Sequence, residues 1–391
     1  MISISRLLCG GVATGDNLRY GKGAAPNSPL KAPKDGRPIV VWNCTQRCNL
    51  HCVHCYSNST DKPYDGELST AEAKKFIQDV AEFGIPVLLF SGGEPLLRPD
   101  LFELATFARS QGLRPVISTN GTLIDEAAAE RLARVGFGEI GISLDGIGES
   151  NDRFRGKQGA YNDALQAIRN CIRAGQKVSL RFTITGQNVQ DLGAIFDLVE
   201  KEGIPRVCFY HLAYSGRGAK IQDSDITHEQ TRAAVDYICS RTQDFYKRGL
   251  EKEVLTVDNH TDAVYLYQKI RKEMPHREAE VLKLLTSNGG NKSGISISCV
   301  DNLGNVHADQ FWWHYSFGSV KQRKFGDIWL DTSDDLMKGL KNRSGLLKGR
   351  CGRCHYVNIC NGNLRVRAEA VYGDVWAEDP ACYLTEEEIS G

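Results

Sequence analysis

The chain has 391 residues, and its 48 Lys and Arg balance its 48 Asp and Glu to a net charge of zero with His neutral. This balance gives no general attraction to nucleic acid or to an anionic membrane, so we expect neither as a partner. The 41% hydrophobic and 25% charged residues are typical of a globular protein, and the length allows two or three domains.

Residues 1–37 are rich in Gly and Pro and show little periodicity, which predicts an irregular N-terminal arm. The start of the arm lacks the apolar segment of an export signal. No apolar run reaches the ~18 residues of a membrane span. We therefore expect a cytoplasmic protein without a membrane span.

From Pro38 onward, short apolar runs alternate with amphipathic stretches. The runs predict strands at 39–42, 86–91, 115–118, 140–144, 178–185 and 206–212. Helices are predicted near 69–84, 99–111, 124–135, 159–174, 188–203 and 228–248. Six such repeats predict an α/β domain over residues 38–250, with a parallel sheet that is either open or an incomplete barrel.

After residue 250 the repeat stops. A charged stretch of helical pattern and a polar loop predict a helical linker over 251–293. A second, smaller domain is predicted over 294–391.

Seven of the thirteen cysteines fall in two tight groups, which is typical of metal ligation in a reducing compartment. Cys48, Cys52 and Cys55 follow the first predicted strand, where parallel sheets carry their chemistry. Three thiolates leave one iron of a four-iron cluster open for a ligand. A structural zinc with Cys44, His51 or His54 as fourth ligand is the alternative.

Small polar motifs end the next three predicted strands. They are Ser91-Gly92-Gly93-Glu94-Pro95, Ser118-Thr119-Asn120-Gly121 and Ser143-Leu144-Asp145-Gly146. Each is an ordinary turn sequence by itself, but their serial placement beside the cysteine triplet predicts one ligand pocket.

The cysteine triplet with the following Tyr56 and the Gly-Gly-Glu-Pro motif resembles the radical S-adenosylmethionine (SAM) superfamily. The resemblance implies an incomplete (β/α)6 barrel and a [4Fe-4S] cluster on Cys48, Cys52 and Cys55, whose open iron binds SAM. It implies reductive cleavage of SAM to a 5′-deoxyadenosyl radical, which abstracts a substrate hydrogen. The residues that it places around SAM are Tyr56, Gly92, Gly93, Glu94, Ser118, Asn120, Ser143 and Arg181.

The second group, Cys351, Cys354, Cys360 and Cys382, supplies enough thiolates for a closed four-iron cluster or a structural zinc. Its spacing resembles the auxiliary cluster of SPASM or twitch-type radical SAM enzymes. That resemblance implies a second [4Fe-4S] cluster, although Leu364 stands where the full SPASM pattern has another Cys. The remaining thiols are expected to be buried hydrophobes or relics, and these are Cys9, Cys44, Cys171, Cys208, Cys239 and Cys299.

Three segments are candidates for the substrate. The aromatic run 306–315 contains His307 and His314, which would bind an iron or a carboxylate but are individually better explained as packed core residues. Arg365 and Arg367 alternate on one face, as carboxylate ligands or as a solvated strand edge. Arg153 and Arg155 follow the fourth predicted strand.

Motifs along nearly the whole chain resemble the tetrapyrrole-modifying radical SAM enzymes, above all the branch that acts on 12,18-didecarboxysiroheme. They include 42–48, 90–98, 309–315 and 365–384. The resemblance implies removal of two acetate side chains to give iron-coproporphyrin III in siroheme-dependent haem synthesis, with an external ferredoxin or flavodoxin-type electron donor. The alternatives are haem d1 propionate removal, coproporphyrin decarboxylation, SPASM-type peptide maturation, and a non-enzymatic iron–sulfur or zinc protein.

Overall fold

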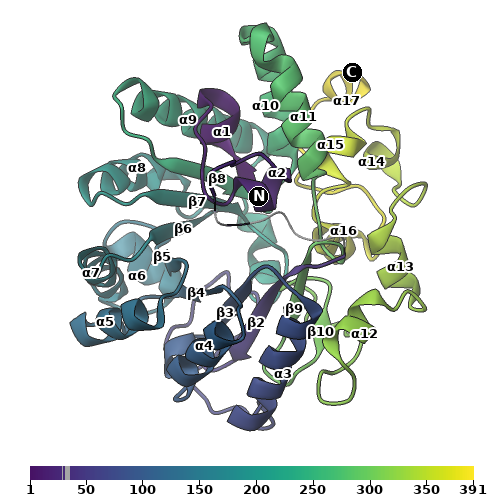
Figure 1. The fold of residues 1–391 in the computed structure, drawn as a ribbon. Coiled ribbons are helices and arrows are strands. Elements are labelled where there is room, and N and C mark those ends of the chain that lie inside the picture. The colour runs from purple at the N-terminus through teal and green to yellow at the C-terminus, as the bar shows by residue number, and fades with distance from the viewer. Residues whose placement is uncertain (29, 31–35) are drawn as a thin grey trace.

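The computed structural model describes residues 1–28, 30 and 36–391. In this part of the chain, one ten-stranded sheet has the order β1-β8-β7-β6-β5-β4-β3-β2-β9-β10 (Figure 1). The strands from β8 to β9 in this order are all parallel, whereas β1 and β10 pair antiparallel at the two edges. The strands are β1 (Ile2–Ser3), β2 (Ile39–Thr45), β3 (Leu88–Gly92), β4 (Pro115–Thr119), β5 (Ile140–Ser143), β6 (Val178–Ile184), β7 (Arg206–His211), β8 (Glu253–Val257), β9 (Ile297–Val300) and β10 (Val306–His307).

Helices surround the curved sheet on its outer side (Figure 1). The helices up to the end of the last barrel repeat are α1 (Ile4–Cys9), α2 (Asp16–Tyr20), α3 (Thr70–Phe83), α4 (Leu101–Ser110), α5 (Glu126–Val135), α6 (Glu149–Arg155), α7 (Ala160–Arg173), α8 (Leu192–Lys201) and α9 (His228–Lys247). Those that follow are α10 (Thr261–Glu273), α11 (Glu278–Asn288), α12 (Phe325–Leu330), α13 (Asp335–Lys341), α14 (Gly349–Arg353), α15 (Val357–Cys360), α16 (Arg365–Tyr372) and α17 (Glu386–Ser390). Short 3-10 turns lie at Pro95–Leu97, Val189–Asp191, Gly218–Ser224 and Pro275–Arg277.

All six predicted strand–helix repeats are present, from β2 with α3 to β7 with α9. The helix of the first repeat, α3, is preceded by its N-cap Ser69. The Ser69 side chain accepts from the backbone N–H of Glu72, and the Glu72 side chain accepts from the backbone N–H of Ser69, so a capping box satisfies the start of α3. Phe76 of α3 packs against Trp42 of β2 with ring centroids 5.5 Å apart. The expected α/β barrel-like sheet is therefore confirmed.

The sheet has more parallel strands than the sequence predicted. β8 lies within 251–293, where we expected a helical linker, and pairs in parallel with β7. β9 lies within the expected second domain, yet pairs in parallel with β2. Both strands are short, so the periodicity of their few residues was too weak to separate them from the charged sequence around them. Helices α10 and α11 also lie within residues 251–293.

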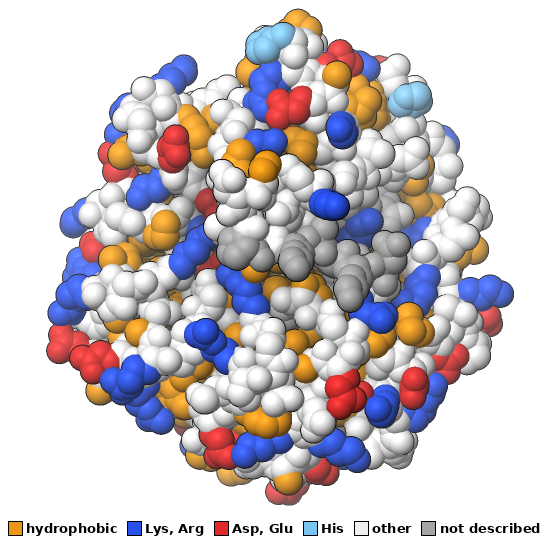
Figure 2. All heavy atoms as spheres, viewed as in Figure 1, with side chains coloured by type: hydrophobic (Ala, Val, Ile, Leu, Met, Phe, Trp, Pro, Cys, Tyr) orange, Lys and Arg blue, Asp and Glu red, His pale blue; other side chains and the backbone are white. Residues whose placement is uncertain are grey.

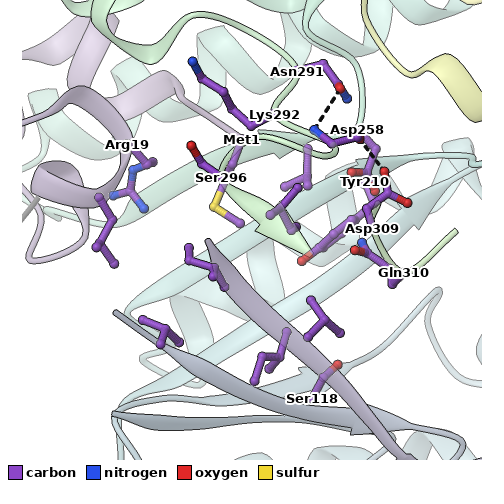
Figure 3. A pocket seen from close by; sticks show the side chains of 18 of the residues that line it. Met1, Arg19, Ser118, Tyr210, Asp258, Asn291, Lys292, Ser296, Asp309 and Gln310 are labelled. Atoms are coloured by element: carbon purple, nitrogen blue, oxygen red, sulfur yellow. Dashed lines mark hydrogen bonds between the residues drawn. The ribbon is translucent and has the colours of Figure 1, made fainter. Parts of the chain in front are cut away.

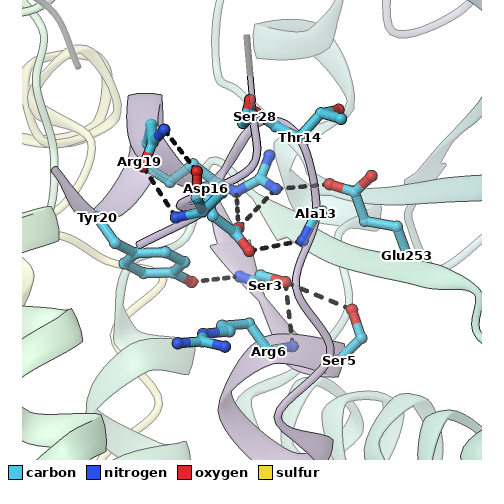
Figure 4. Close-up of polar contacts among 12 residues, drawn as sticks. Ser3, Ser5, Arg6, Ala13, Thr14, Asp16, Arg19, Tyr20, Ser28 and Glu253 are labelled. Carbon is cyan, nitrogen blue, oxygen red and sulfur yellow. Dashed lines mark hydrogen bonds and ion pairs between the residues drawn. The ribbon is translucent and has the colours of Figure 1, made fainter. Parts of the chain in front are cut away.

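The expected irregular arm is partly regular structure, since its first twenty residues form β1, α1 and α2. Ser3 of β1 lies opposite Leu255 of β8 and caps α1 by accepting from the backbone N–H of Arg6. Tyr20 accepts from the backbone N–H of Ser3, and Arg19 contacts Glu253 at 2.6 Å (Figure 4). The arm was misread because its anchors are contacts to β8, far away in sequence. Residues 29 and 31–35 of the arm lie outside the described residues.

Positive and negative side chains are interspersed over the face seen in Figure 2, as the zero net charge suggests. Among the described residues, no helix combines the length and apolar character needed to cross a membrane.

Candidate cofactor and substrate site

The cysteine triplet lies on the loop that leaves β2 at the carboxyl end of the sheet. The loop is fixed through its backbone, because Cys48 donates to the carbonyl of Thr60 and His51 donates to that of Arg155. Cys48 and Cys52 are buried, and Cys55 is half-buried. Burial, the carboxylate of Glu94 and the neighbouring thiols of Cys52 and Cys55 raise the pKa of Cys48 to about 12.

The end of β3 approaches this loop so closely that a side chain has no room. A Cβ atom on Gly92 would lie 2.1 Å from the carbonyl oxygen of Thr45, and one on Gly93 would lie 2.1 Å from that of Arg47. Gly92 also has φ of +133°, a conformation that favours glycine. Both glycines therefore hold the cysteine loop against the sheet by backbone contact.

Glu94, the residue after Gly93, has no solvent-exposed surface. Its Oε1 accepts from Thr119 Oγ1 at 2.7 Å and from the backbone N–H of Leu96, and its Oε2 accepts from the backbone N–H of Asn120 at 2.8 Å. Burial raises the pKa of this carboxyl group, against the effect of the three donors. Because a carboxylate oxygen accepts two bonds, Oε2 retains one acceptor position for a ligand such as an ammonium.

A cavity of about 900 Å³ fills the space enclosed by the sheet. It is lined at the cysteine end by Tyr56, Ser91, Ser118, Ser143 and Arg181, and its walls come from strands on both sides of β2 (Figure 3). Its volume lies within the range of roughly 300–1,000 Å³ found for ligand pockets.

The expected SAM contacts divide into two sets. Tyr56, Ser118, Ser143 and Arg181 line the cavity, whereas Gly92, Gly93, Glu94 and Asn120 are not part of its lining. Asn120 donates to Asn49 Oδ1 at 2.9 Å and toward Cys48 Sγ at 3.8 Å. The guanidinium of Arg181 fits because Gly141 opposite it has no side chain, and its Nε is buried without a partner among the described residues. An unpaired buried cation of this kind is suited to a ligand carboxylate.

Tyr56 presents its side chain as well as its backbone to the cavity. Its hydroxyl donates to Asn43 Oδ1 at 3.1 Å and lies 3.3 Å from Ser91 Oγ, and its ring meets Phe311 edge-on at 5.5 Å. The predicted aromatic run thus contributes one wall of the cavity through Phe311.

Arg155, expected near the substrate, is mainly bound to the cysteine loop. It forms an ion pair with the fully buried Asp145 and donates to Cys52 Sγ at 3.6 Å. It also lines the cavity, beside His54. A cation directed at a cysteine sulfur stabilises the thiolate form that an iron cluster requires.

The four C-terminal cysteines are all half-buried. Burial raises the pKa of Cys360 far above its usual range, and the nearby thiols of Cys351, Cys382 and Cys354 add to the increase. Among residues 1–28, 30 and 36–391, no three His, Cys, Asp or Glu side chains converge closely enough to chelate one metal ion.

Two of the expected substrate arginines have a structural role instead. Arg365 and Arg367 lie in helix α16 rather than on a strand edge, and both are fully buried. Arg365 donates to the carbonyls of Val375, Ala377 and Gly362. Arg367 pairs with Asp379 and donates to the carbonyls of Leu212 and Asp258. Their two-residue spacing suggested a strand, but the bonds that fix them are tertiary.

The other substrate candidates also lie outside the cavity lining. Arg153 is exposed and lies 4.0 Å from Glu149 on the same helix. His307 is buried and bonded to Asp301 and to the carbonyl of Tyr315, as expected for a packed histidine. His314 is exposed and bonds to Glu369.

Several lining residues were not predicted, among them Tyr210, His211 and Asp258. Tyr210 and His211 end β7, and Asp258 follows β8 with φ of +65°. The rule that polar residues at strand ends form the site applies to Tyr210 and His211 at the end of the predicted strand 206–212, and it would have found Asp258 as well, had β8 been recognised.

Comparison with known proteins agrees with this geometry. Residues 42–199 match the family model of the radical SAM superfamily. The chain is 58% identical over 394 aligned positions to Fe-coproporphyrin III synthase of Methanosarcina barkeri, covering 100% of this chain and 99% of the relative. The chain belongs to the radical SAM superfamily.

It is also 44% identical to the pre-heme d1 synthase of Dinoroseobacter shibae, over 93% of this chain and 90% of that one. An AdoMet-dependent heme synthase of Methanosarcina barkeri is 31% identical over 88% of this chain and 95% of its own length. The solved structure of Streptococcus suis SuiB with S-adenosylmethionine has a TM-score of 0.72 at 16% identity, covering 89% of this chain and 78% of that chain, which shows the fold alone. As a radical SAM enzyme, this protein uses a [4Fe-4S] cluster and SAM, and the triplet, Arg155 and Asn120 supply a suitable donor set.

Proposed function

We propose that this enzyme removes two acetate side chains from 12,18-didecarboxysiroheme and forms iron-coproporphyrin III in siroheme-dependent haem synthesis. The observation that carries the proposal is a large cavity with aromatic and cationic lining that begins at the cysteine loop. The full-length similarity to an Fe-coproporphyrin III synthase supports it.

The chain's own residues have distinct tasks. Cys48, Cys52 and Cys55 hold the cluster, and Arg155 and Asn120 direct donors at two of their sulfurs. The remaining acceptor position of Glu94 receives the SAM ammonium, with Gly92 and Gly93 keeping the backbone close. Ser118, Ser143, Arg181 and Tyr56 face the cavity and orient the rest of SAM.

When bound, the reduced cluster and SAM supply a 5′-deoxyadenosyl radical that takes a hydrogen atom from the substrate. The protein places the macrocycle so that the reacting side chains face the cysteine end, and it excludes water from that end. A low-potential ferredoxin or flavodoxin-type protein delivers the electrons.

The residues from 294 onward form a twitch-like region that holds an auxiliary [4Fe-4S] cluster on Cys351, Cys354, Cys360 and Cys382. Because four thiolates saturate such a cluster, it relays electrons or stabilises the structure rather than binding substrate.

Anaerobic turnover with SAM, a strong reductant and didecarboxysiroheme tests the proposal. We expect 5′-deoxyadenosine together with a tetrapyrrole that has lost the mass of its acetate groups. Peptide maturation is the second candidate, because a mycofactocin maturase of Mycobacterium tuberculosis is 31% identical over 84% of this chain. Tetrapyrroles that leave SAM cleavage unchanged, with a peptide that stimulates it, would overturn the proposal.

A further inference from the structure

The cavity has two unlike ends. One lies at the cysteine loop, where the parallel strands finish. The other lies where the strands begin, and is lined by Arg114 before β4, Arg206 at the start of β7 and Ser296 before β9. Figure 3 shows Arg19, Lys292 and Ser296 on one side of the cavity and Ser118 and Gln310 on the other.

Some cations at this second end are neutralised by the protein. Arg206 forms ion pairs with Glu139 and Glu253, and Arg19 forms ion pairs with Asp16 and Glu253. These arginines are occupied within the fold and have little capacity left for a ligand.

Three further cations line the same end and form no ion pair with a described residue: Arg114, Lys292 and Lys341. The carboxylate of Glu139 is close enough to Arg114 to oppose the lowering of its pKa. Arg114 donates to the carbonyl of Gly138 at 2.9 Å. Lys341 donates to the carbonyl of Gly294 at 3.1 Å and lies 4.4 Å from the centre of the Trp329 ring. The ammonium group of Lys292 has no hydrogen bond or ion pair to a described residue, whereas its backbone carbonyl accepts from Ile295, Ser296 and Ile297.

Keeping these cations partly buried costs the empty protein free energy. Burial lowers the pKa of Lys341 to about 8, and burial lowers the pKa of Lys292 and of Arg114 as well. A cation taken out of water without a counter-charge is retained at a ligand site when an anionic ligand supplies the missing charge.

Their spacing suits a wide ligand. Arg114 precedes β4, and Lys292 and Lys341 lie near the start of β9, with β3 and β2 between. Three strand spacings correspond to about 14 Å along the sheet. A ligand that bridges them must carry carboxylates well apart on its periphery.

We propose that Arg114, Lys292 and Lys341 bind the carboxylates that the tetrapyrrole keeps in the product, an inference that rests on the proposed function. Holding those groups at the strand-start end turns the side chains to be removed toward the cysteine loop. This set replaces Arg153, Arg365 and Arg367, which lie outside the cavity lining, as the carboxylate-binding part of the site.

The test is anaerobic titration of the holoenzyme with iron-coproporphyrin III and, separately, with its fully esterified form. We expect esterification to weaken binding to the unaltered protein. Arg114→Gln, Lys292→Met and Lys341→Met should each weaken binding of the free acid by roughly tenfold or more. In the triple variant the free acid and the ester should bind alike, because the cations that tell them apart are gone.

Arg134→Gln and Lys338→Met are matched controls, since both side chains are exposed and Lys338 shares helix α13 with Lys341. They should bind the free acid like the unaltered protein. Thermal unfolding and iron content verify that each variant is folded. Free-acid affinity and an ester penalty that persist in the triple variant would overturn the inference alone, whereas an unaltered protein that binds neither tetrapyrrole would overturn the proposed function as well.

Discussion

Glu94 shows how a fully buried carboxylate is both structural and available to a ligand. Thr119 and the backbone N–H groups of Leu96 and Asn120 occupy three acceptor positions and join the end of β3 to the end of β4. The fourth position is the one that we assign to SAM. Under this assignment, the same side chain stabilises the strand ends and binds the cofactor.

Glu94→Gln tests both roles. In the glutamine variant an NH2 group replaces one carboxylate oxygen. The N–H or O–H group that donated to that oxygen then has no acceptor, so the free energy of unfolding should fall by about 1–3 kcal/mol. SAM affinity should fall at least about tenfold, since a charged acceptor is lost. Chemical unfolding and equilibrium dialysis measure the two effects. Glu82→Gln, at an exposed position, should change neither, and unaltered SAM binding in Glu94→Gln would contradict the assignment.

At the scale of the element, the approach of β3 to the cysteine loop depends on backbone contact. Gly93→Ala would place a methyl group 2.1 Å from the carbonyl oxygen of Arg47. This contact is too short, and it can be relieved only if the cysteine loop moves. We expect loss of most of the iron at the triplet and of SAM cleavage. Gly193→Ala in α8 is the matched control, since its nearest neighbour is the mobile end of Tyr237 at 3.0 Å. Its stability should stay equal or rise by up to about 1 kcal/mol, and normal cleavage by Gly93→Ala would refute the proposed close fit.

The ion pairs between β8, β7 and the N-terminal segment predict a dependence of stability on pH. Burial opposes ionisation of Glu253, but Arg19, Arg206 and Lys177 outweigh it and lower its pKa to about 2. A lowered folded-state pKa stabilises the protein above the unfolded value of about 4.5, and this contribution is lost as pH falls toward 2. Its size is about 3 kcal/mol at neutral pH.

Glu253→Gln should therefore be less stable than the unaltered protein by about that amount at pH 7, and the difference should shrink between pH 4.5 and 2. Urea unfolding of both proteins over this range measures it, and taking the difference cancels the effect of acid on the clusters. Glu251→Gln, on an exposed neighbouring residue, is the control. A constant gap between the two curves would show that Glu253 is not the group that titrates.

The elements that were predicted from the sequence are determined by residues within them. The elements that were missed depend on contacts with residues far away in the sequence. The six strand–helix repeats have long periodic patterns and caps such as Ser69 with Glu72, so their own residues specify them. β1, β8 and β9 are stabilised by pairing with distant strands. Likewise, the cysteine triplet and the glycine motif are recognised from the spacing of their residues. Arg365 and Arg367 donate to backbone carbonyls that no local sequence pattern reveals.

At the scale of the whole molecule, the C-terminal cysteine group is tied to the barrel at the cavity. Arg367 bonds to the carbonyls of Leu212 and Asp258, which follow β7 and β8. Tyr383, next to Cys382, donates to the buried Asp262 at 2.8 Å, and Asp262 contacts His211 at 2.9 Å. These contacts connect the second cysteine group to strand ends that line the cavity.

This connection predicts the effect of removing one C-terminal ligand. If Cys354 holds the proposed auxiliary cluster, Cys354→Ala should lower the iron content from about eight to about four atoms per chain, because that cluster loses a ligand while the triplet keeps its own. Tetrapyrrole turnover should fall more than SAM binding, since the cavity wall loosens but the β3 and β4 ends do not. Cys171→Ala, which removes a buried thiol of α7 outside both groups, should retain the full iron content. Iron analysis with parallel turnover assays tests this prediction. Equal iron content in Cys354→Ala and Cys171→Ala would mean that Cys354 holds no cluster. The C-terminal region would then stabilise the barrel through its arginine and tyrosine contacts alone.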